Sequence, residues 1–138
     1  MTLISLATRV HFAEGVFEDA LRAELELRRL TRPLVLTEPG AGALWAERLG
    51  PALPRGAEAE IAETDVINAS EAEARALAAR FRAEGRDGWI AIGAGPVIDL
   101  AKAAVLAGAS EAPLARYAAG GGGHARIPVG LPPLLAVP

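Results

Sequence analysis

The chain has 138 residues, of which 51% are hydrophobic, and a formal net charge of −3, which suits one compact domain with its own core. Basic and acidic residues are interspersed and cysteine is absent, which excludes disulfides and cysteine-ligated metals and argues against a nucleic-acid partner. No signal peptide is recognisable and no apolar run approaches the ~20 residues that span a bilayer, so we expect a cytoplasmic protein without membrane contacts.

Several segments have the pattern of helices. Between Gly15 and Leu30, apolar residues recur at helical spacing opposite a charged arc. Ser70 and Glu73 fit a capping box at the start of another helix. Pro96 suits a first helical position, where its missing N–H is no loss. The expected helices cover residues 15–30, 43–49 (stopped by Gly50 and Pro51), 70–85, 96–107 and, as one short helix, 112–117.

Short apolar runs between these helices predict the strands. The runs PLVLT and GWIAIG are continuously apolar at their centres, which is typical of strands buried on both faces of a parallel sheet. The expected strands cover residues 33–37, 59–63, 88–93 and 134–137. Residues 9–12 (RVHF) alternate and are expected as a strand or a strand-like entry. Residues 118–133, with a GGGG run at 120–123, predict an irregular, flexible connection. Strands that alternate with helices predict a single α/β domain over 1–138, with a mostly parallel sheet flanked by helices.

Ligands of such sheets bind beyond the carboxyl ends of the strands. Three segments are expected there: the turn that begins at Glu38, the turn GAGP, and whatever follows Val137. Glycine allows close backbone approach, and the free N–H groups of a helix start favour an anion, so Gly93 and Gly95 suit a pyrophosphate. A tight turn without a ligand is an equally good reading of this pattern. The stretch matches neither G-x-G-x-x-G nor the Walker loop.

The stretch GAGPVIDLAK (93–102) resembles the Gly-Gly-Gly-Ser-x-x-Asp-x-x-Lys motif of the iron-containing (group III) alcohol dehydrogenases. Three further segments resemble this family in the same order: VHFAEG (10–15) its Phe-Gly-x-Gly turn, RPLVLTEPG (32–40) its second strand, and LPPLLAVP (131–138) the lead-in to its Pro-Thr-Thr segment. The resemblance implies an N-terminal, Rossmann-like domain that binds NAD(H) or NADP(H).

The same resemblance implies a following helical domain, in which one Asp and three His hold a divalent metal such as Fe²⁺ or Zn²⁺. Those ligands would come after Pro138, so residues 1–138 would form a truncated cofactor half. The substrate of the full-length enzyme would be a small alcohol or carbonyl compound. We expect the isolated chain to be inactive, and the face that meets the second domain to favour self-association.

Carried over by position, the resemblance implies cofactor-binding roles for particular residues. Gly93 and Gly95 match the pyrophosphate turn, and Asp99 and Lys102 match the acid and the lysine of the motif. Glu38 matches the acid that meets the adenosine ribose. A carboxylate there accepts a hydrogen bond from the 2′-hydroxyl and repels a 2′-phosphate, so the resemblance implies NAD rather than NADP.

Three positions depart from the family pattern. Ala94 replaces the middle glycine of the turn, and its methyl narrows the room for a pyrophosphate. Pro96 replaces serine, so a hydroxyl and a backbone donor are lost and only van der Waals contact remains. Ala13 replaces a glycine in the first turn. Weaker cofactor binding than is typical of the family is therefore expected.

Other chemistry-bearing residues have plainer interpretations. Asp99 and Lys102, three positions apart on one helix, also fit a simple ion pair. His11 is expected at a strand edge with no partner, and His124 as a solvated loop residue rather than a metal ligand. Trp45 and Trp89 are expected to be packing residues.

Two other functions stay open beside an alcohol dehydrogenase domain. One is a related domain, of the glycerol dehydrogenase or the dehydroquinate-synthase-like type, which shares the glycine turn and the following acid. The other is a nucleotide-binding or oligomerisation module without chemistry of its own.

Overall fold

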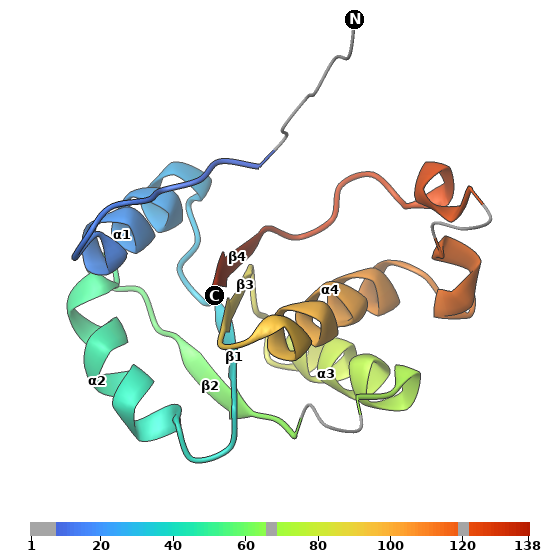
Figure 1. Cartoon of the computed structure of the whole chain (residues 1–138), viewed down its shortest axis with the longest axis horizontal. Coiled ribbons are helices and arrows are strands. Elements are labelled where there is room, and N and C mark those ends of the chain that lie inside the picture. Colours follow the sequence, from blue (N-terminus) through green and yellow to red (C-terminus); the bar gives the residue numbers. More distant parts are fainter. Residues whose placement is uncertain (1–7, 66–68, 119–121) are drawn as a thin grey trace, which may run out of the picture.

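The computed structural model describes residues 8–65, 69–118 and 122–138. The elements, with η for a 3-10 helix, are α1 (Phe17–Arg28), β1 (Leu34–Thr37), α2 (Gly42–Ala52), β2 (Glu60–Glu63), α3 (Glu71–Ala83), β3 (Trp89–Ile92), α4 (Gly95–Ala109), η1 (Leu114–Tyr117), η3 (Gly123–Arg126) and β4 (Leu134–Val137). The four strands form a parallel sheet in the order β2-β1-β3-β4. Helices α1 and α2 lie on one side of it, and α3 and α4 on the other (Figure 1). The predicted α/β fold is confirmed.

The central strands are apolar throughout because both faces of the sheet are covered. Successive strand side chains point to opposite faces. Leu36 and Ala91 therefore pack with α3 and α4, whereas Val35 and Ile90 pack with α1 and α2. All four are 0% exposed. The edge strand β2 (EIAE) is less apolar, since only one of its four residues is buried.

The two tryptophans are packing residues, as predicted, and the structure places them on opposite sides of the sheet. Trp89 stacks on Phe81 of α3, with 4.6 Å between ring centroids and 4° between ring planes. Trp45 contacts Phe17 across the α1–α2 contact, with 5.6 Å between ring centroids.

Helix α2 is longer than predicted. It runs through Gly50 and Pro51, which were expected to stop it. Proline disfavours a helical backbone in the residue before it, partly through contact with that residue's Cβ, and Gly50 has no Cβ. Pro51 stands in the last turn, and the N–H of Leu53 still donates to the carbonyl of Leu49 at 3.0 Å. The pair is therefore tolerated at this helix end.

The strand predicted at residues 9–12 is wrong, because this segment lies outside the sheet. It is held on α1 through Glu24, whose side chain is only 8% exposed. His11 Nε2 lies 2.8 Å and Arg9 Nε 3.1 Å from Glu24 Oε1. Arg28 binds the other oxygen at 3.2 Å. The hydrogen bond with His11, followed by the charges of Arg9 and Arg28, holds the pKa of Glu24 below its ordinary range.

His11 therefore has a partner, contrary to expectation. A buried carboxylate requires counterions, and the basic residues of this segment supply them. Alternation along four residues did not reveal this, because the partner lies on the following helix.

The start of α3 shows half of the predicted capping box. Ser70 Oγ accepts from the N–H of Glu73 at 3.2 Å. The carboxylate of Glu73 accepts instead from the hydroxyl of Thr64, just after β2. This contact ties α3 to the end of the edge strand.

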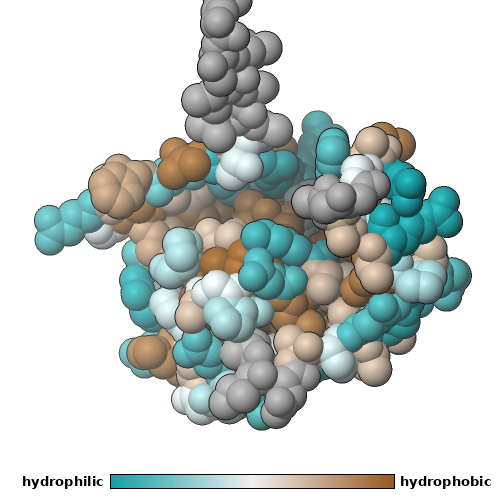
Figure 2. All heavy atoms as spheres, turned by 45° about the vertical axis from the view of Figure 1, so that its right-hand side comes forward, coloured by the Kyte–Doolittle hydropathy of each residue, from teal (hydrophilic) through white to brown (hydrophobic). Residues whose placement is uncertain are grey.

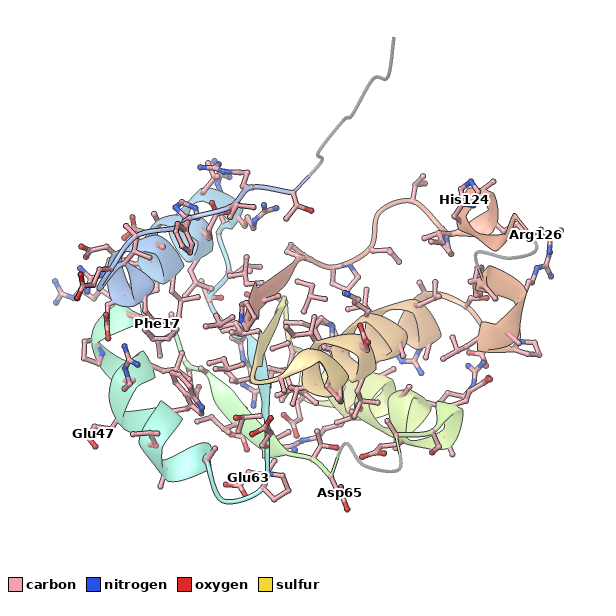
Figure 3. The ribbon with its side chains drawn as sticks, in the orientation of Figure 1. Phe17, Glu47, Glu63, Asp65, His124 and Arg126 are labelled. Carbon is pink, nitrogen blue, oxygen red and sulfur yellow. The ribbon has the colours of Figure 1, made fainter. Side chains whose placement is uncertain are left out.

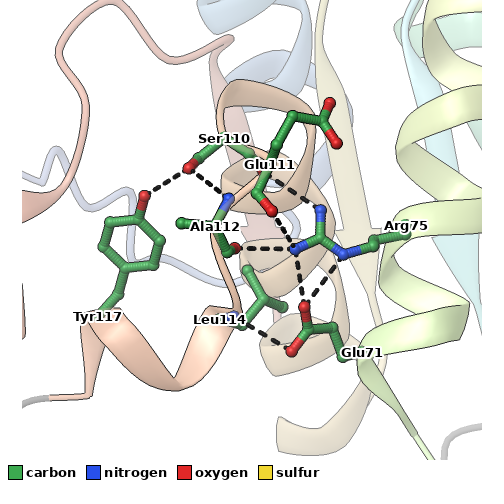
Figure 4. Close-up of polar contacts among 7 residues, drawn as sticks. All are labelled: Glu71, Arg75, Ser110, Glu111, Ala112, Leu114 and Tyr117. Atoms are coloured by element: carbon green, nitrogen blue, oxygen red, sulfur yellow. Dashed lines mark hydrogen bonds and ion pairs between the residues drawn. The ribbon is translucent and has the colours of Figure 1, made fainter.

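The connection after α4 is anchored to α3 by polar contacts (Figure 4). Arg75 binds the Glu71 carboxylate at 2.7 Å and donates to the carbonyl of Ala112 at 2.8 Å. Glu71 also accepts from the N–H of Leu114 at 3.1 Å, at the start of η1. The short helix expected at 112–117 is thus present as a 3-10 turn.

The structure describes only part of the irregular connection that is expected at 118–133. It contains the 3-10 helix η3, while Gly120 and Gly121 of the glycine run lie outside the described residues. His124 lies on η3, away from Glu63 at the opposite side of the fold (Figure 3). On the face shown in Figure 2, hydrophilic and hydrophobic side chains are interspersed. Among the described helices, none is long and apolar enough to cross a membrane.

Candidate functional site

Two turns meet where the chain reverses direction across the sheet. Strands β1 and β3 pair in parallel at its centre, with Leu36 opposite Ala91. From β1 the chain moves outward to β2, and from β3 it moves to the other side, to β4. The carboxyl ends of β1 and β3 therefore flank a topological switch point, the usual place for a ligand in such sheets.

Gly93 makes the turn after β3 and requires glycine for two reasons. Its φ of +143° lies in a region that side chains rarely adopt. An added Cβ would lie 3.0 Å from Val97 Cγ2 and 3.3 Å from Glu38 Oε1. The N–H of Gly93 donates to the carbonyl of Val137 at 3.0 Å, so this turn is also tied to the end of β4.

The start of α4 is open to solvent. Ala94 is the N-cap residue, and its side chain makes no capping hydrogen bond. Ala94, Gly95 and Pro96 are exposed, and an added Cβ on Gly95 would meet nothing within 4 Å. The dipole of a helix start favours an anion there.

Glu38 reaches this turn from the end of β1. Its Oε1 accepts a hydrogen bond from the N–H of Ala94 at 3.2 Å. The structure thus brings together three of the residues that the sequence singled out: Glu38, Gly93 and Ala94. The carboxylate already uses one of the donors that a phosphate at this turn would need.

Asp99 and Lys102 form the expected ion pair one turn further along α4. Lys102 Nζ lies 3.2 Å from Asp99 Oδ1, and their side chains are 63% and 75% exposed. Among the described contacts, neither side chain bonds to the Glu38–Gly93 turn. Both stay candidates only through the family resemblance.

Glu63 is a residue that the sequence analysis did not single out. Its two carboxylate oxygens accept hydrogen bonds from the N–H groups of Gly40 (2.9 Å) and Gly42 (2.8 Å). These two bonds hold the pKa of Glu63 below its ordinary range. The sequence signal was a glutamate at the end of a parallel strand, next to a strand followed by a Gly-x-Gly turn. Figure 3 shows Glu63 beside the turn into α2.

The lowered pKa of Glu63 predicts a pH-dependent contribution to stability. A carboxyl group whose pKa is lower in the folded state stabilises the fold above its unfolded pKa. That stabilisation is lost as pH falls through the folded pKa. We therefore expect Glu63→Gln to unfold at lower urea concentration than wild type at pH 7, with the difference disappearing on acidification. Urea unfolding across a pH series measures this, and a difference that persists in acid would contradict it.

An open hollow of about 810 Å³ is lined by the N-terminal segment, α1 and β4. It reaches Ile98 in the first turn of α4 and Pro138 after β4. The walls are mostly apolar, and two large side chains of the N-terminal segment, Val10 and Phe12, are 75% and 99% exposed.

Metal-ligating side chains are scattered. In the described ranges, no group of three or more His, Cys, Asp or Glu residues is arranged to hold a metal ion.

Comparison with known proteins places this geometry in context. The family model for iron-containing alcohol dehydrogenases matches residues 7–138. The chain is 34% identical over 138 residues to the 4-hydroxybutyrate dehydrogenase of Cupriavidus necator. The matched region covers 100% of this chain and 36% of that protein.

Two solved structures have the same fold. The NADH-dependent butanol dehydrogenase A of Thermotoga maritima superposes with a TM-score of 0.70 at 16% identity, covering 85% of this chain and 30% of that one. The maleylacetate reductase of Agrobacterium tumefaciens gives a TM-score of 0.62 at 26% identity, covering 76% of this chain and 29% of that one. The chain thus spans about a third of the length of these relatives.

Proposed function

The chain belongs to the iron-containing alcohol dehydrogenase family, and from that premise we propose that the turns after β1 and β3 bind NAD(H). One observation carries the proposal: the positive-φ glycine turn at Gly93 leads into the exposed start of α4, and the carboxylate of Glu38 is bonded to that turn at the switch point. Of the functions that the sequence left open, the family match supports the dehydrogenase domain.

Backbone groups of the turn at 93–95 would face the pyrophosphate. Gly95 leaves free space where a side chain would otherwise stand, and the dipole of α4 favours the negative charge. Pro96 has no N–H to donate and would contribute van der Waals contact alone. Asp99 and Lys102 would support the first turn of the helix.

Glu38 would select the cofactor. A carboxylate accepts hydrogen bonds from the ribose 2′-hydroxyl and repels a 2′-phosphate, so NAD is favoured over NADP. Its present bond to the N–H of Ala94 holds the side chain at the turn. When bound, NAD⁺ supplies the acceptor for a hydride from an alcohol.

The whole enzyme would interconvert an alcohol and a carbonyl compound, as the name of the 4-hydroxybutyrate dehydrogenase suggests. Among the described residues, no group of three or more His, Cys, Asp or Glu is arranged to hold the divalent metal that is expected for the family. A cytoplasmic location, self-association and the inactivity of these 138 residues alone stay predictions.

The variant Glu38→Gln tests the proposal. We expect wild type to bind NADH more tightly than NADPH, and Glu38→Gln to weaken NADH binding by roughly tenfold while improving NADPH binding relative to NADH. Titration calorimetry with each dinucleotide measures both affinities. Glu47→Gln is the matched control, because it removes the same charge from an exposed position on α2 that points away from the turn (Figure 3). If the ratio of NADH affinity to NADPH affinity is unchanged in Glu38→Gln, Glu38 does not select the cofactor.

A further inference from the structure

We propose that Glu63 is a positioning residue for the ribose end of the cofactor, because it fixes the turn that carries Glu38. The inference rests on the proposed function. Glu63 would touch neither ribose nor phosphate, and would act only through the backbone of residues 39–42.

The register of the sheet places Glu63 where this is possible. It is the last residue of β2 and lies opposite Thr37, the last residue of β1. Glu38 comes next in the chain, and the turn that follows it folds back over the end of β2. The N–H of Thr64 donates to the carbonyl of Thr37 at 3.0 Å, so the two strand ends are held in register up to this point.

The carboxylate of Glu63 grips the turn at two points. Its Oε2 accepts from the N–H of Gly40, and its Oε1 from that of Gly42, the first residue of α2. A carboxylate is favoured at a helix start, where it meets free N–H groups and the positive end of the dipole. Between these points, the N–H of Ala41 donates to the carbonyl of Glu38 at 3.2 Å.

The glycines of the turn fit this grip. Gly40 has a φ of +81°, which favours glycine. A Cβ on Gly42 would lie 2.5 Å from Glu63 Oε1, so only glycine lets the carboxylate approach so closely. The sequence EPGAG therefore reads as a turn built to be held by a neighbouring carboxylate.

The grip continues to the glycine turn of the candidate site. The carbonyl of Glu38 accepts a hydrogen bond from the N–H of Ala41, and its side chain accepts one from the N–H of Ala94. Two adjacent turns are thus joined in a chain of contacts that runs from Glu63 through residues 40–42 and Glu38 to the start of α4. Loss of the first contact frees the backbone that aims the carboxylate of Glu38.

A double-mutant cycle on the 138-residue chain tests this inference. NADH and NADPH affinities are measured for wild type, Glu38→Gln, Glu63→Gln and the double variant, with Glu47→Gln as the control for charge. We expect Glu63→Gln to weaken NADH binding roughly tenfold in the wild-type background and less than about twofold in the Glu38→Gln background. The ratio of NADH affinity to NADPH affinity should fall in Glu63→Gln and stay unchanged in Glu47→Gln.

The outcomes separate the two proposals. Equal losses in both backgrounds would mean that Glu63 acts only on stability, which overturns this inference and leaves the proposed function standing. No NADH binding by wild type would reject both. If Glu63→Gln does not fold, amide hydrogen exchange in wild type decides: NADH should slow exchange at Gly40 and Gly42, and unchanged exchange overturns the inference.

Discussion

Gly93→Ala is expected to lower the free energy of unfolding by about 1–3 kcal/mol. At a φ of +143°, any side chain strains the backbone, and the new methyl would press on Val97 and on the carboxylate of Glu38. Gly95→Ala offers a matched comparison two residues on, because its backbone is not in the positive-φ region and its Cβ would meet nothing. That variant should keep or slightly raise stability, by up to about 1 kcal/mol.

Both variants should bind NADH more weakly than wild type, but for different reasons. Gly93→Ala displaces Glu38 and the turn itself, whereas Gly95→Ala leaves the fold intact and fills the space proposed for the pyrophosphate. Urea unfolding and NADH titration on both proteins measure this. Equal stability of the two variants would contradict the account of Gly93, and wild-type affinity in Gly95→Ala would contradict the placement of the pyrophosphate.

Trp89→Ala is expected to lower the free energy of unfolding by about 3–5 kcal/mol. Trp89 opens β3, is 1% exposed, and stacks on Phe81 between the sheet and α3. Its removal leaves a cavity in the core shared with α3 and α4. The effect is large because a domain of this size has only some 5–15 kcal/mol of stability in total.

Trp89→Phe should lose far less stability than Trp89→Ala, because it removes less volume and leaves a smaller cavity. The indole Nε1 has no hydrogen-bond partner among the described residues, so phenylalanine sacrifices no bond and keeps the stacking. Urea unfolding of both variants, followed by circular dichroism, tests the pair. A loss in Trp89→Phe as large as that in Trp89→Ala would show that stacking on Phe81 is not what holds Trp89.

The sequence predicted the sheet well because its strands are marked by burial. The runs LVLT and WIAI are buried at every position, and their apolar character follows from having helices on both faces. The prediction of a strand at 9–12 was wrong because alternation alone cannot distinguish a strand from an irregular segment that is held in place by contacts with a charged residue. His11 and Arg9 face a buried glutamate 13 and 15 positions away, a contact that local pattern does not encode.

The candidate site was predictable only where its residues lie in one motif. Gly93 stood out from its place after a strand, and its φ gives the physical reason for glycine. The contact between Glu38 and Ala94 joins residues 56 positions apart. The sequence predicts only that the loops of these residues lie at the same edge of the sheet. Glu63 was missed because its role depends on the pairing of β2 with β1, and on the approach of its carboxylate to Gly42.

The most direct test of the account is a calorimetric titration of the 138-residue chain with NADH and then with NADPH. We predict saturable binding of NADH and much weaker binding of NADPH, because the turn at Gly93 is proposed to accept a pyrophosphate and Glu38 to repel a 2′-phosphate. Failure to bind either dinucleotide, in a chain shown to be folded, would contradict the assignment of these turns as a cofactor site.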